Sequence, residues 1–126
     1  MWWPFSSKKD SDTLTVFKFD YSPLKVDMHS HILPGLDDGA ENTETSILLI
    51  KDLLELGFSK LIATPHVMGE FYPNSSEKIL TAHKKLLKAI ENEELPIEIE
   101  TAAEYYVDDH FMDLVAAKDI LTFGDK

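Results

Sequence analysis

The sequence contains no cysteine. Disulfide bonds, thiolate metal sites and cysteine nucleophiles are therefore excluded for this chain. Any metal site or catalytic centre that it holds must be built without a cysteine sulfur.

Basic residues are also scarce. The chain has 12 Lys and Arg residues against 23 Asp and Glu residues, which gives a formal net charge of −11 at pH 7. Binding to nucleic acid through phosphate neutralisation needs clustered positive charge. The basic residues are few and scattered, so no nucleic-acid partner is expected.

Long hydrophobic runs are absent as well. No apolar run approaches the ~20 residues that a membrane-spanning helix needs. The first five residues, Met1 to Phe5, are apolar, but Lys8 and Lys9 follow them, whereas a secretory signal carries its positive charges in front. We therefore expect no membrane span and a cytoplasmic location.

The length allows one modest core. A chain of 126 residues with 44% hydrophobic residues has no room for two ordinary domains. Residues 1–23 are mixed in character and are interpreted as an N-terminal appendage, in which residues 14–19 alternate like a short edge strand. Residues 24–126 are expected to hold the core.

This core region alternates strand, loop and helix three times. Strands are predicted at residues 26–29, 60–64 and 97–103, and helices are predicted to begin at Asn42 or Thr43, at Asn74 and at Asp108. Such alternation indicates an α/β fold with parallel strands and crossover helices.

Two finer predictions concern the second helix and the chain end. The buried stripe of the second helix is expected to consist of Ile79, Leu86, Leu87 and Ile90. Residues 120–126 read as a further strand that enters a turn.

Four candidate ligands follow the predicted strands. In parallel α/β sheets and barrels, the ligand site forms at the carboxyl ends of the strands. His29, His31, His66 and Glu104 all fall at these ends. The sequence therefore predicts one site that gathers these side chains.

The strongest signal is the pair His29 and His31. Two imidazoles two residues apart at the end of a strand project to the same side and can chelate one cation. Asp37 and Asp38 follow on a glycine-containing turn, where one of them can serve as an oxygen ligand or can orient an imidazole. The sequence pattern alone leaves the choice between these two aspartates open.

His66 and Glu104 extend this set. Pro65 holds the backbone extended, so the imidazole of His66 is expected to have a fixed direction. Glu104 follows the third apolar run, and a carboxylate in this position can bridge two metal ions. His83 and His110, by contrast, lie within predicted helices and are expected on solvated faces.

Three segments resemble a known family. Residues 26–40, VDMHSHILPGLDDGA, are similar to the first motif of the polymerase and histidinol phosphatase (PHP) superfamily, and Thr64-Pro65-His66 and residues 103–106, AEYY, are similar to its second and third motifs. More narrowly, these segments and the terminal residues 121–126 resemble the bacterial manganese-dependent tyrosine-protein phosphatases of capsule and exopolysaccharide synthesis. The resemblance runs from about residue 25 to the end.

The resemblance implies the fold. Members of the family adopt a distorted (β/α)7 TIM-like barrel, so residues 24–126 are expected to form its first three to four βα units, the N-terminal half of the PHP phosphoesterase domain. A histidine-proline motif with a nearby arginine, and a late Asp-x-His motif, are absent from this sequence.

The resemblance also implies the roles of the site residues. His29, His31 and Glu104 would share one metal ion, Glu104 would bridge to a second, and Asp37, favoured over Asp38, would join His66 at a third. Up to three divalent ions are implied for the intact domain, with manganese first and iron or zinc as alternatives. Glu104 and His66 are the expected catalytic residues.

The implied reaction is the hydrolysis of phosphotyrosine by in-line attack of a metal-activated water, without a covalent enzyme intermediate. The implied substrate is a phosphotyrosine protein, such as a bacterial tyrosine kinase.

Three alternatives remain open. The chain could belong to another PHP phosphatase, of the histidinol-phosphate type. It could belong to the metal-dependent amidohydrolases or related deoxyribonucleases, which also begin with a His-x-His motif after a first barrel strand. It could also be an inactive half-barrel that binds metal weakly or self-associates through an open sheet edge.

Overall fold

The computed structural model describes residues 20–124 and begins its regular structure with β1 (Val26–Ser30). α1 (Thr43–Glu55) follows a loop, and Asn42 caps it by accepting a hydrogen bond from the Thr45 backbone N–H. β2 (Lys60–Ala63) completes the first crossover. The strand predicted at 60–64 is confirmed up to Ala63, and the helix start at Asn42 or Thr43 is confirmed. The predicted edge strand at 14–19 lies outside the described residues.

The second unit has one more strand than predicted. β3 (His66–Val67) follows β2 after a short break and precedes α2 (Ser76–Asn92). Ser75 caps α2 by accepting a hydrogen bond from the Lys78 backbone N–H, so the helix starts two residues after the predicted Asn74.

The third unit repeats this pattern. β4 (Glu98–Thr101) is followed by β5 (Glu104–Tyr105), and α3 (Asp109–Ala117) begins after the cap residue Asp108, as predicted. The prediction of a strand over the terminal residues is wrong for the described part, because residues 119–124 form no strand. The Leu121 backbone N–H instead donates to the Tyr105 hydroxyl group, which fixes this segment against β5.

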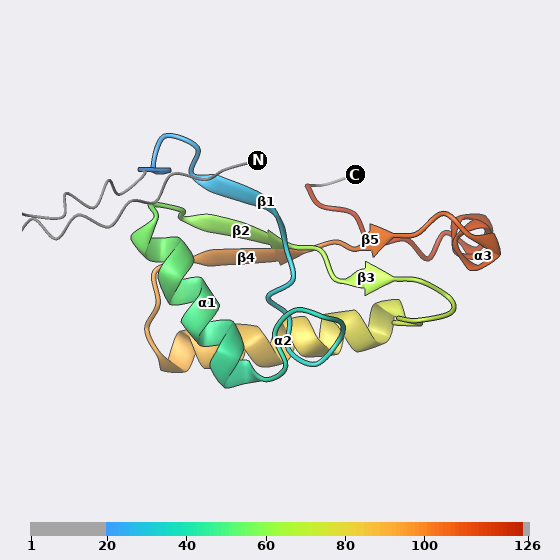
Figure 1. Ribbon diagram of the computed structural model, residues 1–126, viewed down its shortest axis with the longest axis horizontal. Coiled ribbons are helices and arrows are strands. Elements are labelled where there is room, and N and C mark those ends of the chain that lie inside the picture. The colour runs from blue at the N-terminus through green and yellow to red at the C-terminus, as the bar shows by residue number, and fades with distance from the viewer. Residues whose placement is uncertain (1–19, 125–126) are drawn as a thin grey trace, which may run out of the picture.

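The strands form two parallel sheets. The larger sheet has the order β1-β2-β4, and β3 pairs with β5 in the smaller one. α1 and α2 both lie on one face of the larger sheet, and β3 and β5 continue beyond the carboxyl ends of β2 and β4 (Figure 1). The predicted α/β class with parallel strands is thereby confirmed. Closure into a seven-stranded barrel stays a prediction.

The core lies between the larger sheet and the two helices. Ile50 of α1, Leu61 of β2 and Ile79 and Leu86 of α2 are completely buried there. The predicted stripe of α2 is wrong at Leu87, which is 39% exposed, while the small residue Ala82 takes the buried position. Burial of these apolar side chains is the main force that holds the helices on the sheet.

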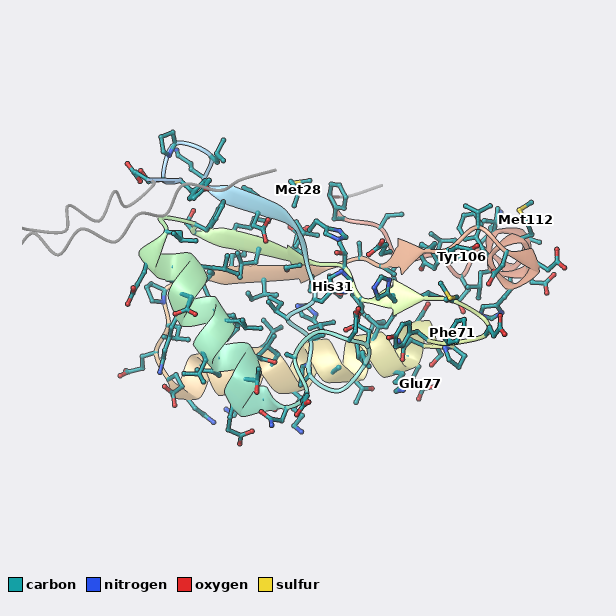
Figure 2. The ribbon with its side chains drawn as sticks, in the orientation of Figure 1. Met28, His31, Phe71, Glu77, Tyr106 and Met112 are labelled. Atoms are coloured by element: carbon teal, nitrogen blue, oxygen red, sulfur yellow. The ribbon has the colours of Figure 1, made fainter. Side chains whose placement is uncertain are left out.

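The opposite face of the larger sheet carries no helix within residues 20–124 (Figure 1). Met28 of β1 is 48% exposed (Figure 2). No helix among the described residues is long and apolar enough to cross a bilayer.

Candidate metal centre

The end of β1 presents the paired histidines. Asp27 pairs with Leu61 and Ser30 with Ala63, so β1 contains one residue more than β2 over this stretch. Such a bulge bends a strand and re-aims its side chains. The Nε2 atoms of His29 and His31 lie 3.3 Å apart. His31 stands where the chain leaves the sheet (Figure 2).

β3 brings the third imidazole to the same place. The rings of His31 and His66 have their centroids 4.5 Å apart, and Tyr72 stacks on His66 at 5.3 Å with nearly parallel ring planes. Tyr72 is held by backbone hydrogen bonds with Met68 in both directions. The loop between β3 and α2 therefore supports the ring of His66 with an aromatic side chain.

Glu104 lies at the centre of the three imidazoles. The register of the small sheet pairs His66 with Glu104 directly. Oε2 of Glu104 lies 3.5 Å from Nε2 of His29, 3.3 Å from Nε2 of His31 and 3.4 Å from Nδ1 of His66. The structure thus gathers the four side chains that sequence analysis singled out, from the ends of three different strands.

The two neighbouring aspartates have different environments. The side chain of Asp37 is 1% exposed, and its Oδ2 accepts hydrogen bonds from Nδ1 of His31 (2.8 Å) and from the His66 backbone N–H (2.9 Å). Its Oδ1 accepts from the Gly39 backbone N–H. Asp38 is 65% exposed, and its Oδ1 lies 3.3 Å from Nε2 of His66.

These contacts set the charge of Asp37. Burial alone would raise the pKa of this carboxyl group, but the hydrogen bonds from His31 and from the backbone of His66 and Gly39 outweigh it, and the pKa lies below its usual value. Asp37 is therefore ionised near neutral pH and accepts the Nδ1 proton of His31. A neutral imidazole in that tautomer presents the lone pair of Nε2 to a cation.

Gly39 allows the loop to close over His31. A Cβ atom at this position would lie 2.2 Å from the His31 carbonyl oxygen and 2.4 Å from its Cβ. The Ala40 backbone N–H donates to the same carbonyl. Only glycine fits here, because the two backbone segments are in contact.

Several supporting residues were not assigned a role from the sequence. The Thr64 hydroxyl lies 2.9 Å from Nδ1 of His29, and the buried Asn74 amide donates to the carbonyl oxygens of Leu36 and His66. The position of Thr64 beside Pro65 and His66 was the one available signal. Nothing in the local sequence pointed to Asn74 in this role.

His83 and His110 stay outside the site. The prediction of a solvated face is wrong for His83, which is half-buried and whose Nε2 lies 2.9 Å from the Ile99 carbonyl oxygen. His110 is half-buried beside Gly69. Neither histidine joins a cluster of metal-ligating atoms among residues 20–124.

The donor set fits divalent cations. Two overlapping groups share His31: one adds Asp37, Asp38 and His66, and the other adds His29 and Glu104, with the ligand atoms of each group within 4.8 Å of one another. Ligand atoms about 2.1 Å from a common ion lie roughly 3.0 to 3.4 Å apart, which is close to the 3.3 to 3.5 Å measured around Oε2 of Glu104. Imidazole and carboxylate ligands suit manganese, iron and zinc.

Known proteins are similar to this chain in sequence and in structure. A sequence model described as capsular polysaccharide synthesis, CpsB/CapC, matches residues 25–126. The chain belongs to the CpsB/CapC family. This membership agrees with the phosphatase resemblance stated for the same residues.

Two curated proteins are similar to this chain in sequence. Tyrosine-protein phosphatase YwqE of Bacillus subtilis (strain 168) is 29% identical over 100 residues, which cover 79% of this chain and 39% of YwqE. The putative tyrosine-protein phosphatase CapC of Staphylococcus aureus is 28% identical over 95 residues, which cover 75% of this chain and 37% of CapC. The chain thus spans about two fifths of the length of each relative.

A solved structure supports the CpsB/CapC assignment. It belongs to a study of YwqE from Bacillus subtilis and CpsB from Streptococcus pneumoniae, described as unique metal-dependent tyrosine phosphatases. Its TM-score is 0.71 at 28% identity, and the match covers 80% of this chain and 41% of the other. The parallel α/β arrangement of residues 20–124 is therefore shared with a metal-dependent phosphatase.

Proposed function

We propose that this chain provides part of the active site of a metal-dependent tyrosine-protein phosphatase that acts in capsule or exopolysaccharide synthesis. The observation that carries the proposal is the convergence of three imidazole nitrogens on one oxygen of Glu104, at 3.3 to 3.5 Å. Family membership and the names of the two relatives supply the substrate class.

The residues divide into ligands and supports. His29, His31 and Glu104 would hold one cation, with Glu104 shared towards a second. Asp38 would join His66 for a further cation, and here the geometry favours Asp38 over Asp37. Both oxygens of Asp37 already accept hydrogen bonds, whereas Asp38 is exposed beside His66.

The expected chemistry follows from these ligands. A divalent cation would neutralise the phosphoryl oxygens and lower the pKa of a water molecule. Asp37 keeps the Nδ1 proton on His31, and Tyr72 fixes the plane of His66. Glu104 and His66 are proposed as the catalytic residues because Oε2 of Glu104 lies 3.4 Å from Nδ1 of His66 and both would hold cations that act on the substrate phosphate.

Manganese is the proposed ion, with iron and zinc as the alternatives that the same ligands allow. The proposed substrate is a phosphotyrosine protein, for which a bacterial tyrosine kinase is the expected example. The sequence contains no arginine, and arginine is the residue that best matches a phosphoryl group through paired hydrogen bonds. We therefore expect slow turnover from the 126-residue chain.

One experiment tests the proposal. Metal content is measured by elemental analysis after manganese loading, and phosphate release is followed from a phosphotyrosyl peptide, with histidinol phosphate, an amide and DNA as comparison substrates. We expect bound manganese and slow release from the peptide alone. Glu104→Gln should lower metal binding by at least about tenfold, while the matched variant Glu94→Gln, on an exposed loop, should leave it unchanged. A metal-free wild-type chain contradicts the proposal.

A second candidate role is self-association without catalysis. β1 and β4 are the outer strands of the larger sheet, and neither pairs with a further strand among the described residues. Unpaired strand edges are templates for pairing with another chain. A catalytically silent chain that still binds manganese and forms oligomers would favour this role.

A further inference from the structure

The paired histidines are held by different groups. Nδ1 of His31 lies 2.8 Å from the carboxylate of Asp37, while Nδ1 of His29 lies 2.9 Å from the hydroxyl oxygen of Thr64. A metal-ligating imidazole usually donates its second N–H to such a partner, which fixes the tautomer and the ring orientation. The partner of His31 is the carboxylate of Asp37, which is charged, and the partner of His29 is the hydroxyl group of Thr64, which is neutral.

We propose that Thr64 is a positioning residue for His29: its hydroxyl accepts the Nδ1 proton, so that Nε2 presents its lone pair to the cation shared with His31 and Glu104. This inference rests on the metal centre of the proposed function. Thr64 lies at the carboxyl end of β2, and the imidazole that it orients belongs to the neighbouring strand β1.

The surroundings of Thr64 suit this role. The residue is only 6% exposed, and its backbone N–H donates to the Ser30 carbonyl at 2.7 Å. Its hydroxyl oxygen accepts from the Ser30 backbone N–H at 3.2 Å and lies 3.4 Å from the Ser30 carbonyl oxygen. The hydroxyl is therefore fixed to β1 at the residue that follows His29.

These contacts form a short chain of hydrogen bonds. When Nδ1 of His29 donates to the Thr64 oxygen, the hydroxyl proton is free to point to the Ser30 carbonyl. A hydroxyl group can accept and donate at once, which a methyl group cannot. Replacing it by a methyl group leaves the shape of the side chain and removes these two bonds, together with the bond that the hydroxyl accepts from the Ser30 backbone N–H.

His29 lies at the bulge in β1. The register shifts between Asp27 and Ser30, and the side chain of His29 is 58% exposed. An exposed imidazole rotates freely unless a second atom holds it, and holding it before the cation arrives reduces the entropy lost on binding. The Thr64 hydroxyl is the hydrogen-bond partner of Nδ1 of His29.

The test uses three variants and the diamagnetic probe Zn²⁺. Thr64→Val removes the hydroxyl, Thr64→Ser restores it, and Thr101→Val makes the same change on the neighbouring strand, where the hydroxyl contacts only the carbonyl oxygens of Ala63 and Ala102. Zn²⁺ dissociation constants are measured by competition with a chelator, and thermal unfolding is recorded for each metal-free protein.

We expect Thr64→Val to weaken Zn²⁺ binding by about 10- to 100-fold, with Thr64→Ser within a few-fold of wild type and Thr101→Val unchanged. Equal affinities of Thr64→Val and wild type would overturn the inference while leaving the metal centre intact. An equal loss in Thr101→Val would overturn it too, because the effect would then be structural.

A second measurement needs no Thr64 variant. Long-range ¹H–¹⁵N spectra of the Zn²⁺-loaded chain report which imidazole nitrogen carries the proton, and His29→Gln identifies the signals of His29. A proton on Nδ1 supports the inference, and a proton on Nε2 overturns it. If the wild-type chain binds no Zn²⁺, both the inference and the proposed function are wrong. If the wild-type chain binds Zn²⁺ but Thr64→Val binds it equally well, only the role of Thr64 is wrong.

Discussion

Oδ2 of Asp37 joins His31 and His66: it lies 2.8 Å from Nδ1 of His31 and accepts the His66 backbone N–H at 2.9 Å. A single buried oxygen atom thus ties the end of β1 to the start of β3. The carboxylate therefore sets both the tautomer of one imidazole and the backbone position of another.

Replacing this carboxylate should affect folding and metal binding together. Asp37→Asn puts an N–H group among three N–H donors, so buried donors lose their acceptor. We expect the free energy of unfolding to fall by about 1 to 3 kcal/mol, as is usual when a buried polar group loses its partner. Urea denaturation of the metal-free chain measures this change, and an unchanged midpoint would contradict the supporting role.

Asp38→Asn should weaken metal binding with little effect on stability. Asp38 is 65% exposed and lies beside His66, so its replacement should change stability by no more than about 0.5 kcal/mol. Manganese binding should nevertheless weaken, because a charged oxygen ligand is lost. If Asp38→Asn binds manganese like wild type, Asp38 is not the ligand, and Asp37, the aspartate favoured from the sequence, takes that role.

The sequence predicted these loops well and their internal contacts poorly. His29, His31, His66 and Glu104 could be named because parallel strands bring their carboxyl ends to one edge, so position along the chain translates into position in space. Which of Asp37 and Asp38 binds the cation and which supports the histidines depends on contacts with residues up to 29 positions away. No local pattern encodes such contacts.

In the fold, too, the sequence predicted the long elements but not the short strands or the details of packing. Helix periodicity and capping residues predicted α1 and α3, but β3 and β5 have two residues each, too few for an alternating pattern. The predicted buried stripe of α2 consisted of large apolar residues and therefore included Leu87. The helix turns Ala82 inward instead, in line with Ile79 and Leu86.

Replacing Gly39 tests whether the loop must pack against the backbone of His31. Gly39→Ala would place a Cβ atom 2.2 Å from the His31 carbonyl oxygen, closer than any tolerated contact, so the backbone must move. We expect a loss of more than about 3 kcal/mol of stability and loss of manganese binding. Gly124→Ala is the matched control, since nothing lies within 4 Å of its Cβ position, and its left-handed backbone should cost only about 1 kcal/mol. Similar melting temperatures for both variants would refute this account of the loop.

Asp108 gives a pH dependence with a definite sign. Its carboxylate accepts the backbone N–H groups of Phe111 and Gly69, which hold its pKa below the usual value. A lowered folded-state pKa means that the stabilisation is complete above the unfolded value of about 4 and is lost as the pH falls through the folded value.

The matching experiment compares wild type with Asp108→Asn. Wild type should be more stable at pH 7, and the difference should shrink below about pH 4 as the carboxyl group is protonated. Denaturant titrations at several pH values measure it. A difference that stays constant from pH 7 to pH 3 would show that the charge of Asp108 contributes nothing.

The position of β1 as an outer strand among residues 20–124 leads to a prediction about association. β1 is an outer strand of its sheet, and Met28 on it is 48% exposed (Figure 2). An exposed edge with an apolar side chain favours pairing between chains, and a lysine on the edge prevents it. We expect the chain to form concentration-dependent dimers or larger species in sedimentation velocity. Met28→Lys should shift the population towards monomer.

Met112→Lys provides the control for this variant. Met112 is similarly exposed, at 57%, but it lies on α3, away from the sheet (Figure 2). If the sheet edge drives association, Met112→Lys should sediment like wild type, since it adds the same charge at a different place. Association that responds equally to both variants would point to net charge, and a wild-type chain that stays monomeric at all concentrations would show that the edge is protected.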